Sequence, residues 1–108
     1  MRQIEAQMLN AAATGRDWQK DNTSVSNTDH GIVIRLHGHP IARLCTDDQL
    51  LWITDAGWQT NTTKSRLNAL LSQFCPGCGI HQKDFVWYLT RRDYETTMNR
   101  RELYAVSL

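Results

Sequence analysis

The sequence of 108 residues lacks the features that mark several large classes of protein. Twelve Lys and Arg stand against eleven Asp and Glu, so the net charge of +1 is far from the excess of a dedicated DNA-binding protein or an acidic DNA mimic. With 41% hydrophobic residues and only two prolines, the chain is neither disordered nor collagen-like. No apolar run reaches the roughly 20 residues of a membrane span, and the N-terminal segment has no apolar centre of an export signal. We therefore expect one compact domain over residues 1–108, with no membrane as partner.

Cysteine is scarce, and the three that are present form an odd number, which favours a reducing compartment. Cys75-Pro-Gly-Cys78 resembles half of a zinc ribbon, and His81 is the nearest third ligand. A structural zinc site needs a fourth ligand, and no second CxxC exists. The other interpretation is a turn that ends a helix and carries two free thiols. We expect no cofactor, with zinc at Cys75, Cys78 and His81 as the alternative.

Catalytic motifs are absent as well. The sequence contains no G-x-S-x-G, no HExxH and no Walker loop. A small meander with one or two helices also offers little concave volume for a substrate pocket. We therefore expect a protein that is not an enzyme.

The hydrophobic pattern predicts both helices and strands. Residues 3–13 have apolar positions at helical spacing, and the polar stretch that follows, over 21–31, is too rich in Asn, Asp, Ser and Thr for a buried element. From Gly31 the period changes to two, so 31–37 is predicted as a strand with one covered face and with Val33 and Arg35 on the other. Two further strands are expected over 41–45 and 50–54.

A second helix is predicted over residues 62–74, because four apolar side chains form one stripe: Leu67, Leu70, Leu71 and Phe74. A strand is expected over 85–89, and 103–108 also has strand character. The fold class is therefore α+β: an antiparallel meander of four to five strands packed against one or two helices.

The start of that second helix breaks a local rule. The residues that carry the prediction are Trp58, Thr60, Thr62, Thr63, Lys64 and Arg66. The threonines suit an N-cap, but cations in a first turn oppose the helix dipole at a cost of about 0.3–1 kcal/mol each. An external anion, held by free N–H groups, hydroxyls and both cations, would explain them, with Trp58 as an aromatic contact. The alternative is that Asp47, Asp48 or Asp55 neutralises the cations and that Trp58 belongs to the core.

Four arginines near the C-terminus form a second candidate for contact with phosphates: Arg91, Arg92, Arg100 and Arg101. Three acids in the same region, Asp93, Glu95 and Glu102, partly balance their charge. We take these arginines as a secondary basic patch.

Three stretches together resemble a group of small proteins of tailed bacteriophages: NTSV (22–25), IRLHGHPIA (34–42) and WITDAGWQTNTTKSRLNALL (52–71). The shared pattern is an N-T-x-V strand, an L-H-G-N-x-I-A hairpin and a G-W-x-T-x-T-T-K-x-R-L-N helix start. His39 stands where the hairpin more often carries Asn, and the CPGC turn lies outside the pattern. The resemblance implies a phage protein that acts in the cytoplasm of the bacterial host, and it brings no catalytic residues.

The resemblance favours a small accessory protein that occupies a host macromolecule without catalysis. A host protein that it inhibits or redirects is the first expectation, because the near-zero net charge gives little attraction to a polyanion. A nucleic-acid-binding protein that contacts phosphates through residues 60–68 is the alternative. A structural homodimer that pairs through the edge of strand 41–45 is the second alternative.

Overall fold

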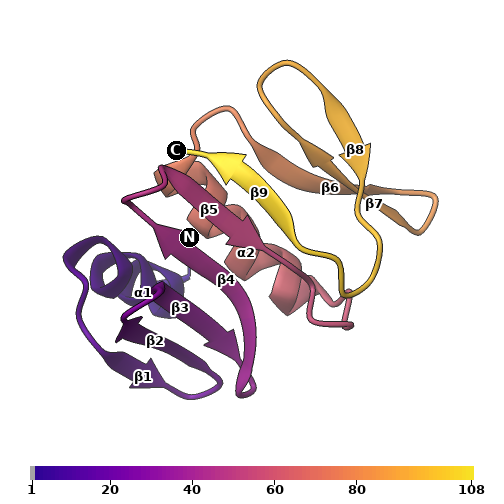
Figure 1. The fold of residues 1–108 in the computed structure, drawn as a ribbon. Coiled ribbons are helices and arrows are strands. Elements are labelled where there is room, and N and C mark those ends of the chain that lie inside the picture. Colours follow the sequence, from indigo (N-terminus) through magenta and orange to yellow (C-terminus); the bar gives the residue numbers. More distant parts are fainter. Residues whose placement is uncertain (1) are drawn as a thin grey trace.

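The computed structural model describes residues 2–108, which form two helices and nine strands (Figure 1). The sheets are antiparallel, so the α+β fold predicted from the sequence is confirmed. The bounds of the elements are α1 Gln3–Thr14, β1 Trp18–Lys20, β2 Thr23–Thr28, β3 Gly31–Leu36, β4 His39–Cys45, β5 Leu50–Ile53, α2 Asn61–Phe74, β6 Gly79–Lys83, β7 Val86–Thr90, β8 Glu95–Thr97 and β9 Tyr104–Ser107.

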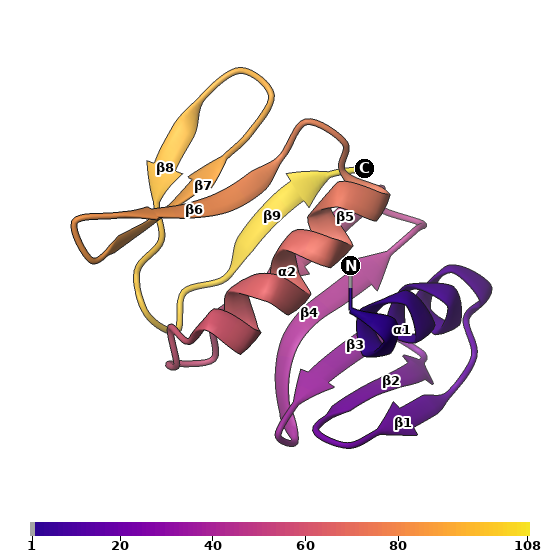
Figure 2. The ribbon, with the colours of Figure 1, turned by 180° about the vertical axis from the view of Figure 1, so that it is seen from behind.

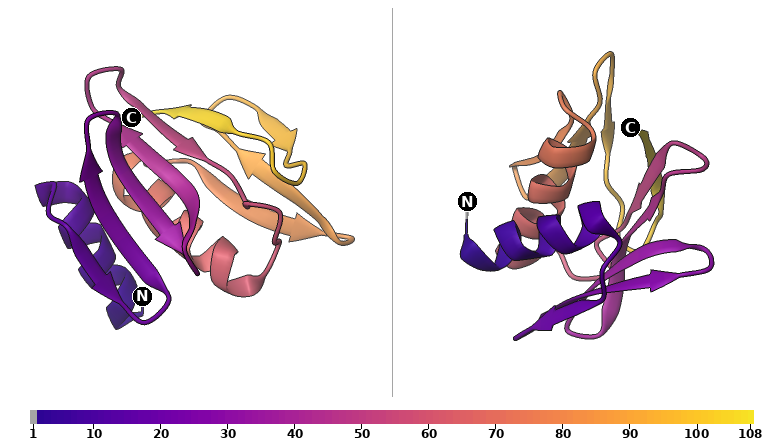
Figure 3. Two further views of the ribbon diagram at one scale, coloured as in Figure 1. Left: turned by 60° about the horizontal axis from the view of Figure 1, so that its bottom comes forward. Right: turned by 90° about the vertical axis from the view of Figure 1, so that its left-hand side faces the viewer.

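The larger sheet has six strands in the order β1-β2-β3-β4-β5-β9. The first five follow the chain as a meander. Strand β9 pairs with β5, so the last element of the chain forms one edge of the sheet. Both helices lie on one face of this sheet, as the view from behind and the side view show (Figures 2 and 3). Neither helix of residues 2–108 lies on the opposite face.

The core lies between this sheet and the two helices. Successive residues of a strand point to opposite faces, so one face of each central strand supplies buried side chains. Helix α2 contributes the stripe Leu67, Leu70 and Leu71, each fully buried, and α1 contributes Met8. Their burial against the sheet is what stabilises helices as short as these.

The smaller sheet contains β6, β7 and β8 and packs against α2. Its inner face buries Ile80, Trp87 and Leu89. Asn68 of α2 fastens the first strand, because its side chain accepts a hydrogen bond from the amide of Ile80 and donates one to the Ile80 carbonyl. The C-terminal third is thus an extension of the core rather than a loose tail.

The structure adds strands that the sequence pattern missed. The polar stretch over 21–31 was predicted to contain no buried element, and this was wrong: it holds β2, with Thr23 and Val25 buried. The predicted four to five strands are in fact six in one sheet and three in another. Short polar strands such as β1, β6 and β8 acquire their structure from neighbours that pair with them, and this is not visible in local sequence.

Candidate functional site

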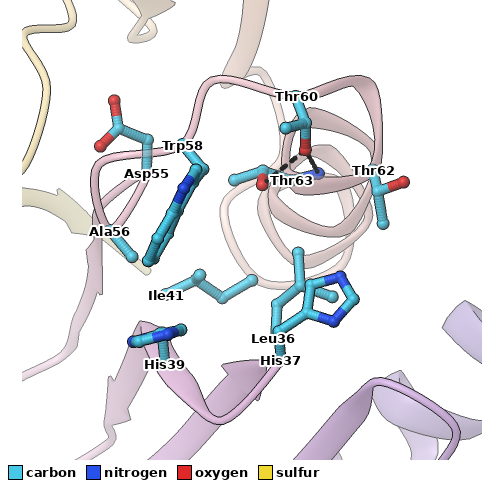
Figure 4. Close-up of a pocket in the computed structure, with 10 residues that line it drawn as sticks. All are labelled: Leu36, His37, His39, Ile41, Asp55, Ala56, Trp58, Thr60, Thr62 and Thr63. Carbon is cyan, nitrogen blue, oxygen red and sulfur yellow. Dashed lines mark hydrogen bonds between the residues drawn. The ribbon is translucent and has the colours of Figure 1, made fainter.

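A pocket of about 450 Å³ lies where the β3–β4 turn approaches the beginning of α2 (Figure 4). It contradicts the expectation that the fold offers little concave volume. Two of the three stretches that carry the phage resemblance meet here, the hairpin of 34–42 and the helix start of 52–71. The residues that line the pocket are Leu36, His37, His39, Ile41, Asp55, Ala56, Trp58, Thr60, Thr62 and Thr63.

Trp58 forms one wall of the pocket, and the indole is half exposed, at 52%. Its ring centroid lies 4.6 Å from that of His39, with the two planes tilted by 49°. Leu36 and Ile41, which are buried, form the floor between the two segments (Figure 4). The interpretation of Trp58 as a core residue was therefore wrong, because a large aromatic surface faces solvent beside a hollow.

The loop that carries Trp58 is held by Asp55, which is buried. One oxygen of this carboxylate, Oδ1, accepts hydrogen bonds from the amides of Gly57, at 2.7 Å, and Arg101, at 2.9 Å. The other, Oδ2, accepts one from the amide side chain of Gln59 at 3.0 Å. Gly57 has φ +95°, and a Cβ there would come within 2.9 Å of Arg101 Nε. The Trp58 side chain is thus presented by a tightly fixed turn.

The start of α2 is capped as the sequence predicted. Thr60 has extended backbone, and its hydroxyl accepts a hydrogen bond from the amide of Thr63 at 3.1 Å. Thr63 is buried, whereas Thr62 is partly exposed at the rim. Lys64 lies outside the pocket lining: its Nζ donates to Gln82 Oε1 at 3.3 Å and lies 6.0 Å from the centroid of the Trp87 ring. One cation therefore remains near the surface at this helix end.

Arg66 does not belong to this site, which corrects the predicted anion site with two cations. It is 3% exposed, and its Nη1 forms an ion pair of 2.7 Å with Glu5 Oε2. Nε donates to Thr23 Oγ1 at 3.0 Å, and Nη2 to Asn22 Oδ1 at 3.4 Å. The suggestion that Asp47, Asp48 or Asp55 neutralises it was also wrong, because the partner is Glu5 on α1.

Glu5 completes a buried polar cluster, which we call the Arg66 cluster: Glu5, Asn22, Thr23, Ser65 and Arg66. Burial alone would raise the pKa of Glu5. The hydrogen bonds from Ser65, at 2.6 Å, and from Arg66, together with the charge of Arg66, outweigh burial and leave that pKa below its ordinary value of 4.5. The carboxylate is thus ionised and paired inside the protein.

The C-terminal arginines divide between two places. Arg91 donates to the Ala105 carbonyl, and Arg92 donates to the carbonyls of Pro76 and Ser107, so both anchor strand β9 or the end of α2. Arg101 packs against Gly57, near the beginning of β9, whereas Ser107 lies at the end of that strand. Arg100 is exposed. The residues of the predicted secondary basic patch thus lie in two places, and the side chains of Arg91 and Arg92 are engaged by backbone carbonyls.

The three residues of the zinc alternative, Cys75, Cys78 and His81, do not converge. Cys75 is buried, and its thiol lies 4.0 Å from the Val106 carbonyl. Burial raises the pKa of this thiol to about 11, so the protonated form dominates. His81 stacks on Tyr88 at 5.3 Å, on the outer face of the small sheet. Within residues 2–108, no three His, Cys, Asp or Glu side chains are placed to hold a metal ion.

His37 and His39 line the pocket, but sequence reasoning did not include them in the site. His37 has φ +52°, and its amide donates to the Asn22 carbonyl at 2.7 Å, so a hydrogen bond fixes the turn. The signal available in the sequence was their position on either side of Gly38 in one of the resembling stretches. That two stretches about twenty residues apart meet at one pocket is a tertiary fact.

The fold and the pocket define a small α+β domain in which a hydrogen-bonded turn presents an aromatic wall beside a ligand-sized hollow. The family model of the Kyanoviridae Gp96 protein matches residues 1–105, nearly the whole chain, so the chain belongs to this family of phage proteins. The expected phage origin is thereby confirmed. No curated protein and no solved structure matches the chain. Over residues 2–108, neither helix has the length and apolar character to cross a membrane.

Proposed function

We propose that this phage protein binds a host protein through the Trp58 pocket and inhibits or redirects that protein without catalysis, in the host cytoplasm. The observation that carries the proposal is the half-exposed Trp58, fixed by the Asp55 turn beside a pocket of about 450 Å³. Rigid, exposed tryptophans next to a hollow are typical of the residues that dominate binding energy at protein interfaces.

The chemistry of the pocket indicates what it accepts. The floor and one wall are apolar, formed by Leu36, Ile41 and Trp58, so an apolar side chain of the partner fits inside. The rim carries His39 and the first turn of α2, whose free N–H groups favour a carboxylate next to that side chain. The carboxylate of Asp55 is already used by the loop, which supports binding rather than catalysis.

The alternative of nucleic-acid binding through residues 60–68 keeps less support. It required Lys64 and Arg66 at one phosphate, and the guanidinium of Arg66 is turned inward to Glu5. The structural homodimer stays a further alternative. Light scattering of the purified chain at several concentrations tests it directly, because a dimer doubles the measured mass.

The test of the proposal is affinity capture from host lysate with the tagged protein and two variants. Trp58→Ala removes the pocket wall, and Leu103→Ala removes a large apolar side chain exposed at 65% outside the pocket, which makes it a matched control. We expect one host protein to be enriched by the wild type and by the control variant, and to be lost with Trp58→Ala. Equal capture by both variants, or no enriched protein, would contradict the proposal.

A further inference from the structure

The face of the six-stranded sheet opposite the helices carries a row of side chains that the proposed function does not use. In register across β3, β4, β5 and β9, Val33 pairs with Arg43, Arg43 with Trp52, and Trp52 with Ala105. Arg35 lies two residues beyond Val33, on the same face. A shallow hollow of about 280 Å³ lies against these side chains and Leu103.

The outward strand positions of this face carry charge of one sign, while Asp29, Asp47 and Asp48 of the adjoining turns line a second hollow together with Arg43. Arg43 is exposed and Arg35 partly so, and within residues 2–108 neither has an acidic side chain within 4.0 Å. Among the residues that the structure describes, the Arg35 guanidinium donates one hydrogen bond, to Ser26 Oγ at 3.1 Å, and its other N–H groups donate to no protein acceptor. By strand alternation, the remaining outward positions of the strands hold no Asp or Glu.

We propose that this open face binds single-stranded nucleic acid, with Arg35 and Arg43 on the phosphates and a base stacked on Trp52. Trp52 is the cross-strand neighbour of Arg43, and Arg35 lies on the next strand beyond Arg43. A partly exposed aromatic ring beside cations on a sheet is an arrangement that sequence-tolerant single-strand binding uses. A second copy of the chain fits this face poorly, because a two-fold contact brings the same unpaired arginines of both copies together. The site is separate from the Trp58 pocket, which lies between the β3–β4 turn and α2.

The test is fluorescence anisotropy with a labelled oligothymidine of about 16 nucleotides, at about 50 and 200 mM salt. The variant Arg35→Gln plus Arg43→Gln removes the two cations of the face. The matched control, Arg16→Gln plus Lys83→Gln, removes two exposed cations elsewhere and changes the net charge equally. Trp52→Leu removes the stacking ring, and Trp58→Ala tests independence from the pocket.

We expect the wild type to bind at the lower salt. The double variant should bind at least tenfold more weakly and lower the slope of log affinity against log salt by about 1.4, since each single-strand phosphate contact contributes about 0.7. Trp52→Leu should weaken binding about tenfold, whereas the control and Trp58→Ala should stay within about twofold of the wild type. No binding at about 50 mM salt, equal weakening by the control, or equally tight binding of a duplex of the same length would overturn the inference.

Discussion

The segment from Gly57 to Asn68 contributes to two regions with opposite character, the Trp58 pocket and the Arg66 cluster. Trp58 is an apolar residue that the fold leaves half exposed, whereas Arg66 is a charged residue that the fold buries to 3% exposure. They lie eight positions apart in the sequence. Each therefore breaks the usual preference of its type, in which large aromatics are mostly buried and arginine is almost never fully buried unless it is paired.

Interactions within the protein explain the unusual burial of Arg66. Four side chains of the same protein account for the burial of Arg66. Glu5 neutralises its charge, Asn22 and Thr23 accept its hydrogen bonds, and Ser65 donates a hydrogen bond to the Glu5 carboxylate. Trp58, by contrast, is held outward by the Asp55 turn, and the half of its side chain that faces solvent buries no apolar surface that would stabilise the fold. The buried cation serves stability, and we propose that the exposed aromatic serves binding. The predictions below separate these two roles.

The largest effect is expected from Arg66→Ala. Removing the guanidinium leaves the Glu5 carboxylate buried without its partner, which costs about 3–5 kcal/mol of the free energy of unfolding. Urea denaturation followed by circular dichroism measures the loss. A loss below about 1 kcal/mol would mean that the Arg66 cluster does not stabilise the fold.

The double variant Glu5→Met plus Arg66→Met is the control for that interpretation. It removes both charges and fills the space with apolar atoms, so we expect it to recover most of the stability lost in Arg66→Ala. A double variant as unstable as the single one would show that packing, rather than an unpaired charge, causes the loss.

Acid weakens the same cluster with a smaller effect, because protonation leaves both side chains in place. The folded-state pKa of Glu5 lies below its ordinary value of 4.5, so the ion pair contributes its full stability above that pH and loses it as pH falls through the lower folded value. Between about pH 6 and pH 3, the wild type should lose more unfolding free energy than Glu5→Gln. Equal losses would contradict the lowered pKa.

Loss of the N-cap of α2 should have an intermediate effect on the free energy of unfolding. Thr60→Ala removes the hydroxyl that accepts from the amide of Thr63 and should cost about 1 kcal/mol of unfolding free energy. Thr62→Ala is the matched control, because within residues 2–108 the Thr62 hydroxyl forms no hydrogen bond that supports the helix start. Urea denaturation of both variants measures the difference, and a control as destabilised as Thr60→Ala would contradict the assignment of the cap.

The smallest effect on stability is expected from Trp58→Ala. Half of the side chain is already in water, so the free energy of unfolding should fall by no more than about 1 kcal/mol. The same urea experiment checks this. A loss comparable to that of Arg66→Ala would place Trp58 among the core residues and remove the contrast between the two regions.

Much of the fold could be predicted from the sequence. Helix α2 follows from its apolar stripe, and β3 follows from alternation, because both patterns depend on neighbouring residues. Strand β2 could not be predicted, since its buried face consists of Thr23 and Val25 within a run of Asn, Ser and Thr. Its structure depends on pairing with β1 and β3, and such pairing leaves little trace in local composition.

The site was predictable only in part, for a related reason. The unusual cations at the start of α2 were a real signal, but the acid that explains Arg66 is 61 residues away in the chain. A local pattern identifies a charge that needs a partner and cannot identify the partner. The exposed position of Trp58 and the cap at Thr60 were within reach, because turn and cap residues act on their immediate neighbours.

The most direct test of the account is the affinity of the captured host protein for the wild type and for Trp58→Ala, measured by isothermal titration calorimetry. If Trp58 is the central contact, its truncation should cost at least 2 kcal/mol of binding free energy, which is about a thirtyfold rise in Kd. The circular dichroism spectrum of the variant should match that of the wild type. A Kd that changes by less than about twofold in a folded variant would contradict the claim that the exposed tryptophan serves binding.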